Sequence, residues 1–172
     1  AFTGDCETTK DILGPFYRPE APIRNDLTDE AQEGELINVK GRVFGDDCTT
    51  PLKDCLVEIW HADTEGDYDN DSEQFRNRAG WKTDKEGAYG FKTILPGRYL
   101  NGSQFRPSHI HCRVKAEGHK ELISQIYFKD DPYIKNDPWA SDKKAELRIL
   151  ELKENDAGLS EVVFDIFLAR IT

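Results

Sequence analysis

The stretch LINVKGRVFG, residues 36–45, has the period-two pattern of a β-strand. The turn residues Asp46 and Asp47 and the loop around Pro51 follow it directly. No internal repeats and no long amphipathic helix accompany this pattern. Working outward, similar segments bounded by turn residues recur at 55–63, 87–94, 109–116, 121–129, 145–153 and 159–170. The sequence therefore predicts an all-β fold, an antiparallel β-sandwich.

Two regions depart from this pattern. Three prolines between positions 15 and 22 indicate that residues 1–35 form an extended N-terminal arm lying over the body. The segment DTEGDYDNDSEQFRNRAG, residues 63–80, is polar, flanked by glycine and too irregular for a strand. At 172 residues the chain is long enough to bury a core of its own, so we expect a single domain over residues 1–172.

Composition excludes two classes of partner. Lys and Arg number 23 against 33 Asp and Glu, which gives a formal net charge of −10. Binding to a phosphate backbone needs a basic surface, and the sequence has no Lys/Arg cluster, so nucleic acid is not an expected partner. A run of about 18 apolar residues is also missing, and a membrane span is not expected. An oligomer is compatible with this sequence, which does not fix the oligomeric state.

The cysteines bear on the compartment. Cys48 and Cys55 flank TTPLKD, a turn-like hexapeptide, and we expect a disulfide between them; a zinc site is the rival, but no C-x-x-C pair occurs. Cys6 is left as paired, free or lipid-bearing. The chain has no methionine, so we expect that a signal peptide or tag preceded Ala1. Together these features predict an extracytoplasmic location.

The stretch RPSHIHCRV, residues 106–114, carries two histidines at alternate positions. Side chains at i and i+2 of a strand leave the same face, so His109 and His111 would be close enough to share a metal ion. The alternative is that a sheet simply contains two histidines. Cys112 has the opposite parity and is expected to face away, in a structural role.

Further ligands must come from elsewhere in the chain. His61 ends a strand and His119 lies in a glycine turn, where a surface or supporting role is more common. Tyr68 in the acidic loop and Tyr99 after Pro-Gly-Arg suggest phenolate ligands instead. Because a phenol has a pKa near 10, phenolate binding requires a hard, strongly charged cation. Two anionic oxygens and two imidazoles favour Fe(III) over Fe(II) or Zn(II).

With these residues the sequence resembles the intradiol ring-cleavage dioxygenases, over roughly residues 14–140. The motifs that carry the resemblance are GPFY (14–17), PLKDCLVEIWHADTEGDY (51–68), GWKTDKEGAYGFKTILPGRY (80–99), RPSHIH (106–111) and SQIYFKDDPY (124–133). The resemblance implies that a non-haem Fe(III) is held by Tyr68, Tyr99, His109 and His111. It also implies that Arg106 and Gln125 lie beside the substrate.

The implied reaction is cleavage of a catechol-type ring between its two hydroxyls with O2, giving a muconate-type diacid. In it the phenolate of Tyr99 would accept a proton from the catechol. The residues that match pocket-lining positions differ in identity from common forms, so the catechol itself is left open. These positions are Phe16, Pro51, Leu52, Pro138 and Trp139, and Arg106 is expected to contact the substrate as well. The helical N-terminal dimerisation region of catechol and hydroxyquinol members is absent from this sequence, whose size is closer to a protocatechuate-type subunit or to small secreted members.

Two rival interpretations remain. Residues 37–60 and 83–97 also resemble transthyretin-like and adhesin β-sandwich modules, which only bind or space other proteins. That class needs neither Tyr68 nor the R-P-x-H-x-H segment. A cupin-type Fe(II) or zinc enzyme also uses H-x-H, but it requires a following Glu and a distant His, and neither is evident here.

Overall fold

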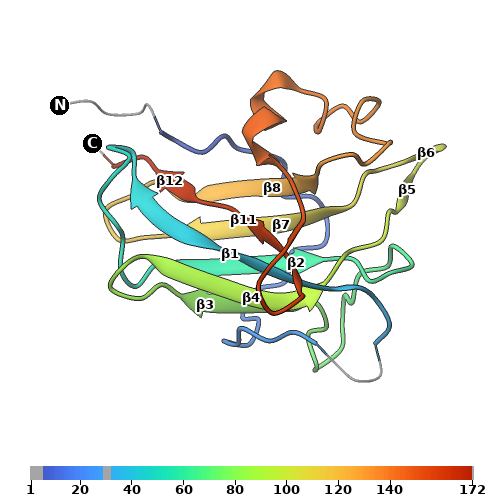
Figure 1. The fold of residues 1–172 in the computed structure, drawn as a ribbon, viewed down its shortest axis with the longest axis horizontal. Coiled ribbons are helices and arrows are strands. Elements are labelled where there is room, and N and C mark those ends of the chain that lie inside the picture. Colours follow the sequence, from blue (N-terminus) through green and yellow to red (C-terminus); the bar gives the residue numbers. More distant parts are fainter. Residues whose placement is uncertain (1–5, 29–31, 172) are drawn as a thin grey trace.

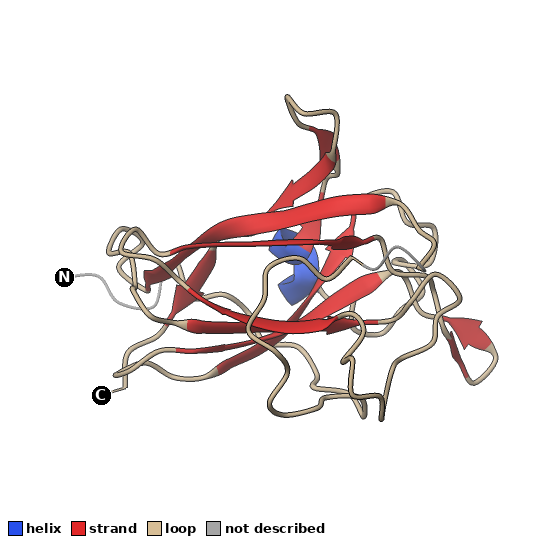
Figure 2. Cartoon of the chain, turned by 90° about the horizontal axis from the view of Figure 1, so that it is seen from below, coloured by secondary structure: helices blue, strands red, loops and turns tan. Residues whose placement is uncertain are grey.

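The computed structural model, which describes residues 6–28 and 32–171, is a β-sandwich of two five-stranded sheets (Figure 1). The two layers are seen nearly edge-on in Figure 2, with a short helix beside them. The buried apolar side chains of both sheets form one core cluster, in which residues such as Ile37, Phe91 and Val57 are fully buried. The predicted all-β sandwich is confirmed.

The first sheet is built around β1 (Leu36–Gly45), which coincides with the stretch that opened the sequence analysis. Its neighbours are β4 (Ala88–Ile94), β10 (Lys153–Glu154), β11 (Ser160–Val163) and β12 (Ile166–Leu168). One edge of β1 pairs with β4 in antiparallel register. Its other edge pairs in parallel with β11 along the first half and with β12 along the second.

A glycine allows the chain to pass from β11 to β12 beside β1. A Cβ atom on Gly41 would lie 1.9 Å from the carbonyl oxygen of Phe164. That same oxygen accepts a hydrogen bond from the hydroxyl of Tyr89 at 2.5 Å. The predicted strand 159–170 is therefore two short strands, because the backbone between them turns its polar groups toward β1 and β4.

The second sheet has the order β3-β2-β7-β8-β9. Its strands are β2 (Leu56–His61), β3 (Arg78–Lys82), β7 (His109–Lys115), β8 (Leu122–Phe128) and β9 (Ile149–Leu150). Its pairs are antiparallel except β8–β9, which is parallel. Both sheets are therefore mixed rather than purely antiparallel. A small hairpin of β5 (Leu100–Asn101) and β6 (Gln104–Phe105) projects near the start of β7 (Figure 1).

Two further expectations need correction. The segment 145–153, predicted as a strand, contains the end of a 3₁₀ helix, η1 (Lys143–Arg148), followed by β9 and the start of β10. Asp142 caps this helix by accepting a hydrogen bond from the backbone N–H of Lys144, and only Ala145 and Arg148 are buried, a spacing of three rather than two. The irregular region 63–80 ends in β3, which has no alternating pattern of burial: Arg78, Ala79 and Gly80 are all buried.

The disulfide differs from the predicted one. Cys48 is bonded to Cys6 of the arm, not to Cys55. Cys55 is fully buried just before β2 and belongs to the apolar core, so its thiol is directed away from the turn that holds Cys48. Cys112 is also an unpaired, buried core residue, as its parity predicted.

The arm runs across the sandwich in an extended path (Figure 1). The N–H of Thr8 donates to the carbonyl of Phe167 in β12, and the N–H of Asp11 donates to the carbonyl of Ile123 in β8, both at 3.0 Å. These bonds tie the arm to one strand of each sheet, and just beyond them the carbonyl of Ile12 accepts from Nε2 of Gln125 at 2.9 Å, beside His111.

Candidate metal centre

The two histidines of β7 and one tyrosine converge at a single point. The hydroxyl oxygen of Tyr68 lies 3.3 Å from Nε2 of His109 and 3.1 Å from Nε2 of His111. The two imidazole rings are 4.9 Å apart between centroids. This is the same-face arrangement that the strand alternation predicted. One oxygen and two nitrogens therefore surround a position that a metal ion would share.

Burial keeps both imidazoles in the form that binds metals. It lowers the pKa of His109 to about 3, with the positive charge of Arg106 as the next cause. Burial also lowers the pKa of His111 well below its ordinary value. Nδ1 of His109 lies 2.8 Å from the carbonyl of Pro107, to which it donates in the neutral tautomer that leaves the Nε2 lone pair available. Near neutral pH both rings are uncharged.

The fourth predicted ligand, Tyr99, lies next to His109 and Tyr68. Its ring is 5.5 Å from the His109 ring and 6.0 Å from the Tyr68 ring between centroids. The two tyrosine-bearing loops approach closely because they contain glycine. A Cβ on Gly66 would lie 2.4 Å from the carbonyl oxygen of Arg98, and one on Gly97 would lie 2.2 Å from a carbonyl oxygen of the Tyr68 loop.

The donor set suits a hard cation. Among the described residues, no group of three or more His, Cys, Asp or Glu side chains is placed to hold a metal, so a complete set here must include the tyrosines. Burial, followed by the charge of Tyr99, raises the pKa of Tyr68 above its ordinary value. A buried phenol of this kind ionises only beside a strongly charged cation, which is the behaviour expected of an Fe(III) ligand.

Arg106 and Gln125, which were predicted to lie beside the substrate, are next to the two histidines. Gln125 pairs with His111 in the register between β8 and β7. Nη1 of Arg106 donates to Oε1 of Gln125 at 3.2 Å and lies 3.3 Å from Nε2 of His109. Burial lowers the pKa of Arg106, but its hydrogen bond to Asp137 and other contacts raise it overall above the ordinary value. This guanidinium is a permanent positive charge beside the candidate ligands.

The structure brings together some of the predicted pocket-lining residues. The ring of Phe16 stacks on Tyr68 at 4.2 Å between centroids, and the Arg106 guanidinium lies over the Trp139 ring at 4.6 Å. Pro138 is exposed next to Trp139.

Pro51 and Leu52 lie elsewhere. The N–H of Leu52 donates to the carbonyl of Val43, and Leu52 packs on the core near the Leu56 end of β2. The histidines are beside the Trp60 end of β2, about 13 Å farther along the strand. The structure does not bring Pro51 and Leu52 to the candidate centre.

The sequence analysis missed several residues that contact the centre. The Trp60 indole stacks on His111 at 5.0 Å and 5° between planes, and Asp137 forms a buried ion pair with Arg106 at 2.9 Å. Tyr127 pairs with His109 in the register of β7 and β8. Strand parity could have found Tyr127, two residues after Gln125, but nothing in the sequence placed Asp137.

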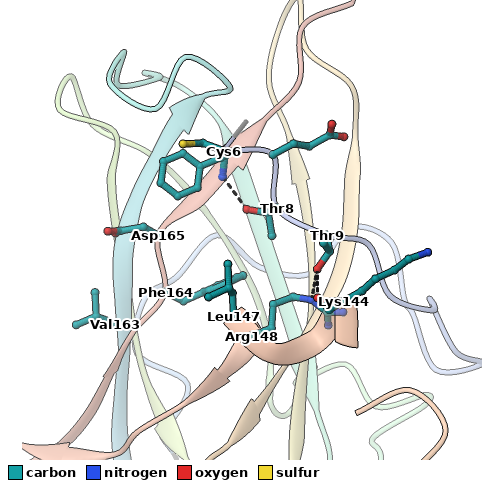
Figure 3. Close-up of a pocket in the computed structure, with 11 residues that line it drawn as sticks. Cys6, Thr8, Thr9, Lys144, Leu147, Arg148, Val163, Phe164 and Asp165 are labelled. Carbon is teal, nitrogen blue, oxygen red and sulfur yellow. Dashed lines mark hydrogen bonds between the residues drawn. The ribbon is translucent and has the colours of Figure 1, made fainter. Parts of the chain in front are cut away.

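A separate cavity of about 370 Å³ lies between the arm, η1 and the β11–β12 connection (Figure 3). Its wall includes Thr9 and Arg148, which are hydrogen-bonded at 2.9 Å, and the highly exposed Leu147. The four candidate ligands are not among its lining residues. Within the part of the chain that the structure describes, no helix meets the length and hydropathy needed to cross a membrane. The fold and the donor set thus define a β-sandwich protein with a candidate centre of two tyrosines and two histidines.

Comparison with known proteins identifies the family of the chain. Residues 12–170 match a family described as Dioxygenase. Catechol 1,2-dioxygenase 2 of Acinetobacter lwoffii is 35% identical over 150 residues, which cover 76% of this chain and 54% of that protein. The protocatechuate 3,4-dioxygenase beta chain of Burkholderia cepacia is 35% identical over 151 residues, or 77% of this chain and 64% of that protein. The chain thus spans between about half and two thirds of the length of these relatives.

Solved structures give the same result. The dioxygenase domain of a dioxygenase–carbohydrate-binding fusion from Streptomyces sp. SirexAA-E has a TM-score of 0.84 at 30% identity, covering 96% of this chain and 99% of that one. Catechol 1,2-dioxygenase from Acinetobacter sp. ADP1 has a TM-score of 0.84 at 29% identity, covering 96% of this chain and 63% of that one. The chain belongs to the intradiol ring-cleavage dioxygenase family.

Proposed function

We propose that this protein is a non-haem Fe(III)-dependent dioxygenase that cleaves a catechol-type ring between its two hydroxyls and forms a muconate-type diacid. The observation that carries the proposal is the convergence of the Tyr68 oxygen with Nε2 of His109 and His111 at 3.1–3.3 Å. Tyr99 completes the donor set. When bound there, a ferric ion would act as a Lewis acid toward the two catechol oxygens.

The protein's own residues supply proton transfer and charge. Tyr99 is the proton acceptor: its phenolate oxygen takes a proton from a catechol hydroxyl, which makes the substrate a better electron donor to O2. Arg106 places a fixed positive charge beside His109, where it stabilises negative charge that develops on the substrate. Gln125 holds Nη1 of Arg106 in this position.

Aromatic side chains favour a flat substrate. Phe16 of the arm stacks on Tyr68, and Trp139 packs against Arg106 on another side of the centre. A catechol ring presents the same flat, apolar faces to both. We propose a catechol-type diol and O2 as the substrates, without choosing among catechol, protocatechuate and hydroxyquinol.

Metal analysis, a visible spectrum and oxygen uptake test the proposal together. The purified protein should hold about one ferric ion per chain and be coloured by phenolate-to-iron charge transfer. It should consume O2 with at least one of the three diols. A colourless protein that carries stoichiometric zinc, or an iron-loaded protein that consumes no O2 with any of them, would contradict the proposal.

Two variants separate metal binding from turnover. His111→Ala removes a ligand and should lose much of the iron together with the colour. Arg106→Ala should retain iron and colour but lose most of its turnover, because its guanidinium stabilises charge on the substrate and is not a ligand. A colourless Arg106→Ala protein that remains folded would show that this assignment of roles is wrong.

We also propose an extracytoplasmic location. The Cys6–Cys48 disulfide supports it, since such bonds persist in oxidising compartments. Intact mass without reductant should be two hydrogens lower than after treatment with dithiothreitol when the protein is taken directly from its native compartment. Fully reduced thiols in that sample would contradict the location.

A further inference from the structure

Hydrogen-bond acceptors surround the guanidinium of Arg106, and only one of its N–H groups is directed toward the candidate centre. Its Nε and Nη2 donate to the two carboxylate oxygens of Asp137 at 2.9 and 3.1 Å, and both side chains are only 2% exposed. Nη2 also donates to the Tyr127 hydroxyl, and Nη1 donates to Gln125, both at 3.2 Å. Four of the five N–H groups of the guanidinium are thereby used. The fifth, on Nη1, lies on the side of His109.

The Tyr127 hydroxyl is itself fixed from the arm. It donates to Oδ2 of Asp11 at 2.6 Å, and the same oxygen accepts from Nη1 of Arg148 at 2.8 Å. Asp11 and Arg148 are 2% and 3% exposed at their side chains, so this ion pair is buried as well. Because the hydroxyl has one proton and gives it to Asp11, its lone pair is presented to Arg106. The orientation of Tyr127 toward Arg106 therefore depends on the N-terminal arm.

We propose that Asp137 and Asp11 are positioning residues for the ring-cleavage reaction: Asp137 directly, and Asp11 through Tyr127, hold Arg106 so that one Nη1–H faces the substrate. Bidentate ion pairs of this kind fix the plane of a guanidinium as well as its position. The carboxylate of Asp137 is bonded to Arg106 and that of Asp11 to Tyr127, so both act on the reaction through Arg106. The expected effect on kcat rests on the proposed dioxygenase function.

The kinetic test is a double-mutant cycle between Asp137 and Arg106. Asp137→Asn should retain iron and colour and lower kcat by about 10- to 100-fold with little change in KM, because a misplaced group costs rate of that order. In the Arg106→Ala background the same change should lower kcat by less than about twofold. Asp137 also accepts hydrogen bonds from the backbone N–H groups of Trp139 and Ala140. If it served only that turn, the loss would be equal in both backgrounds, and the inference would be overturned.

The arm side of the network is tested by Asp11→Asn and Tyr127→Phe. Each should lower kcat several-fold, and the double variant should be no slower than the slower single one, since both act along one path. A double variant whose loss in kcat is the product of the two single losses would refute the proposal that Asp11 acts through Tyr127. Glu161→Gln is the matched control. This carboxylate on β11 is paired with Asn38 and Lys40 of β1 and with Asn155 of the turn before β11, in the sheet that does not carry the histidines, and its loss should leave kcat unchanged.

A second readout does not depend on metal or turnover. In the metal-free protein, the Nε–H of Arg106 should exchange slowly with water in ¹H–¹⁵N spectra, since it is buried against Asp137. Asp137→Asn should speed this exchange at least tenfold, and Glu161→Gln should not. A wild-type protein without oxygen uptake, but with this slow exchange, would refute the proposed function and leave the clamp on Arg106 intact. Fast exchange of this N–H in an active wild-type protein would refute the clamp on Arg106 and leave the proposed function intact.

Discussion

Removal of the Cys6–Cys48 bridge should lower the free energy of unfolding by about 4 kcal/mol. The two cysteines are 42 positions apart, and the loop-closure entropy for a loop of that size gives about 4 kcal/mol at 25 °C. For a chain of this length that corresponds to a fall in Tm of about 10 °C. We expect the loss to destabilise the whole domain, because the arm that carries Cys6 is hydrogen-bonded to both β8 and β12.

Urea unfolding followed by tryptophan fluorescence measures this loss, using the three tryptophans of the chain. The variant is Cys6→Ser/Cys48→Ser, and reduced wild-type protein should unfold at nearly the same midpoint as this variant. Adding reductant to the variant is the control, and it should not move the midpoint. Coincident midpoints for oxidised wild type and variant, or a variant that still responds to reductant, would refute the pairing and the calculated loss.

Three further predictions concern the strands, the histidines and the chemistry. Gly41→Ala should destabilise the domain by about 2 kcal/mol or more, because its Cβ would meet a carbonyl oxygen at 1.9 Å. The control is Gly90→Ala on the neighbouring strand, where the nearest atom to the new Cβ is 3.7 Å away and the cost should be about 1 kcal/mol or less. Equal urea midpoints for the two variants would contradict this prediction. The metal-free protein should lose stability as the pH falls from about 6.5 toward 4, because the folded-state pKa values of His61 (about 4) and His109 (about 3) lie below the pKa of an unfolded histidine, so that unfolding takes up protons. Each histidine should lower the free energy of unfolding by about 1.4 kcal/mol per pH unit in this range. Urea midpoints that do not change between pH 7.5 and 5 would contradict this prediction. Tyr99→Phe should keep iron bound but slow product formation by a factor on the order of 10² or more, measured as oxygen uptake, and cleavage at the parent rate would make Tyr99 a packing residue.

The sequence predicted those features that depend on neighbouring positions. Alternation located β1 at its observed bounds and placed His109 and His111 on one face of β7, with Cys112 turned toward the core. Parity of this kind is a property of the strand itself and needs no knowledge of the rest of the fold. Local sequence was therefore sufficient for half of the candidate centre.

Features that depend on distant partners were not predictable in the same way. Two cysteines seven positions apart suggested a local bridge, but burial of Cys55 in the core and docking of the arm gave Cys48 a different partner. The segment containing Leu147 has apolar residues at alternate positions, yet Leu147 is 89% exposed and the backbone there is helical. Asp137 was missed because its role arises only when its turn packs against Arg106.

The contacts of the arm also fix the order in which the protein can be assembled. The N–H of Phe167 donates to the hydroxyl of Thr8 across 159 positions, so a segment near the start of the chain is held by one near its end. During synthesis the arm leaves the ribosome before β12, so this contact forms only after β12 has been made. Gly14, whose Cβ would lie 3.2 Å from the His111 ring, belongs to the same arm. Contacts of such range form slowly. A nascent chain that already contains all four candidate ligands can thus still lack β12, one of the two strands that hold its arm in place.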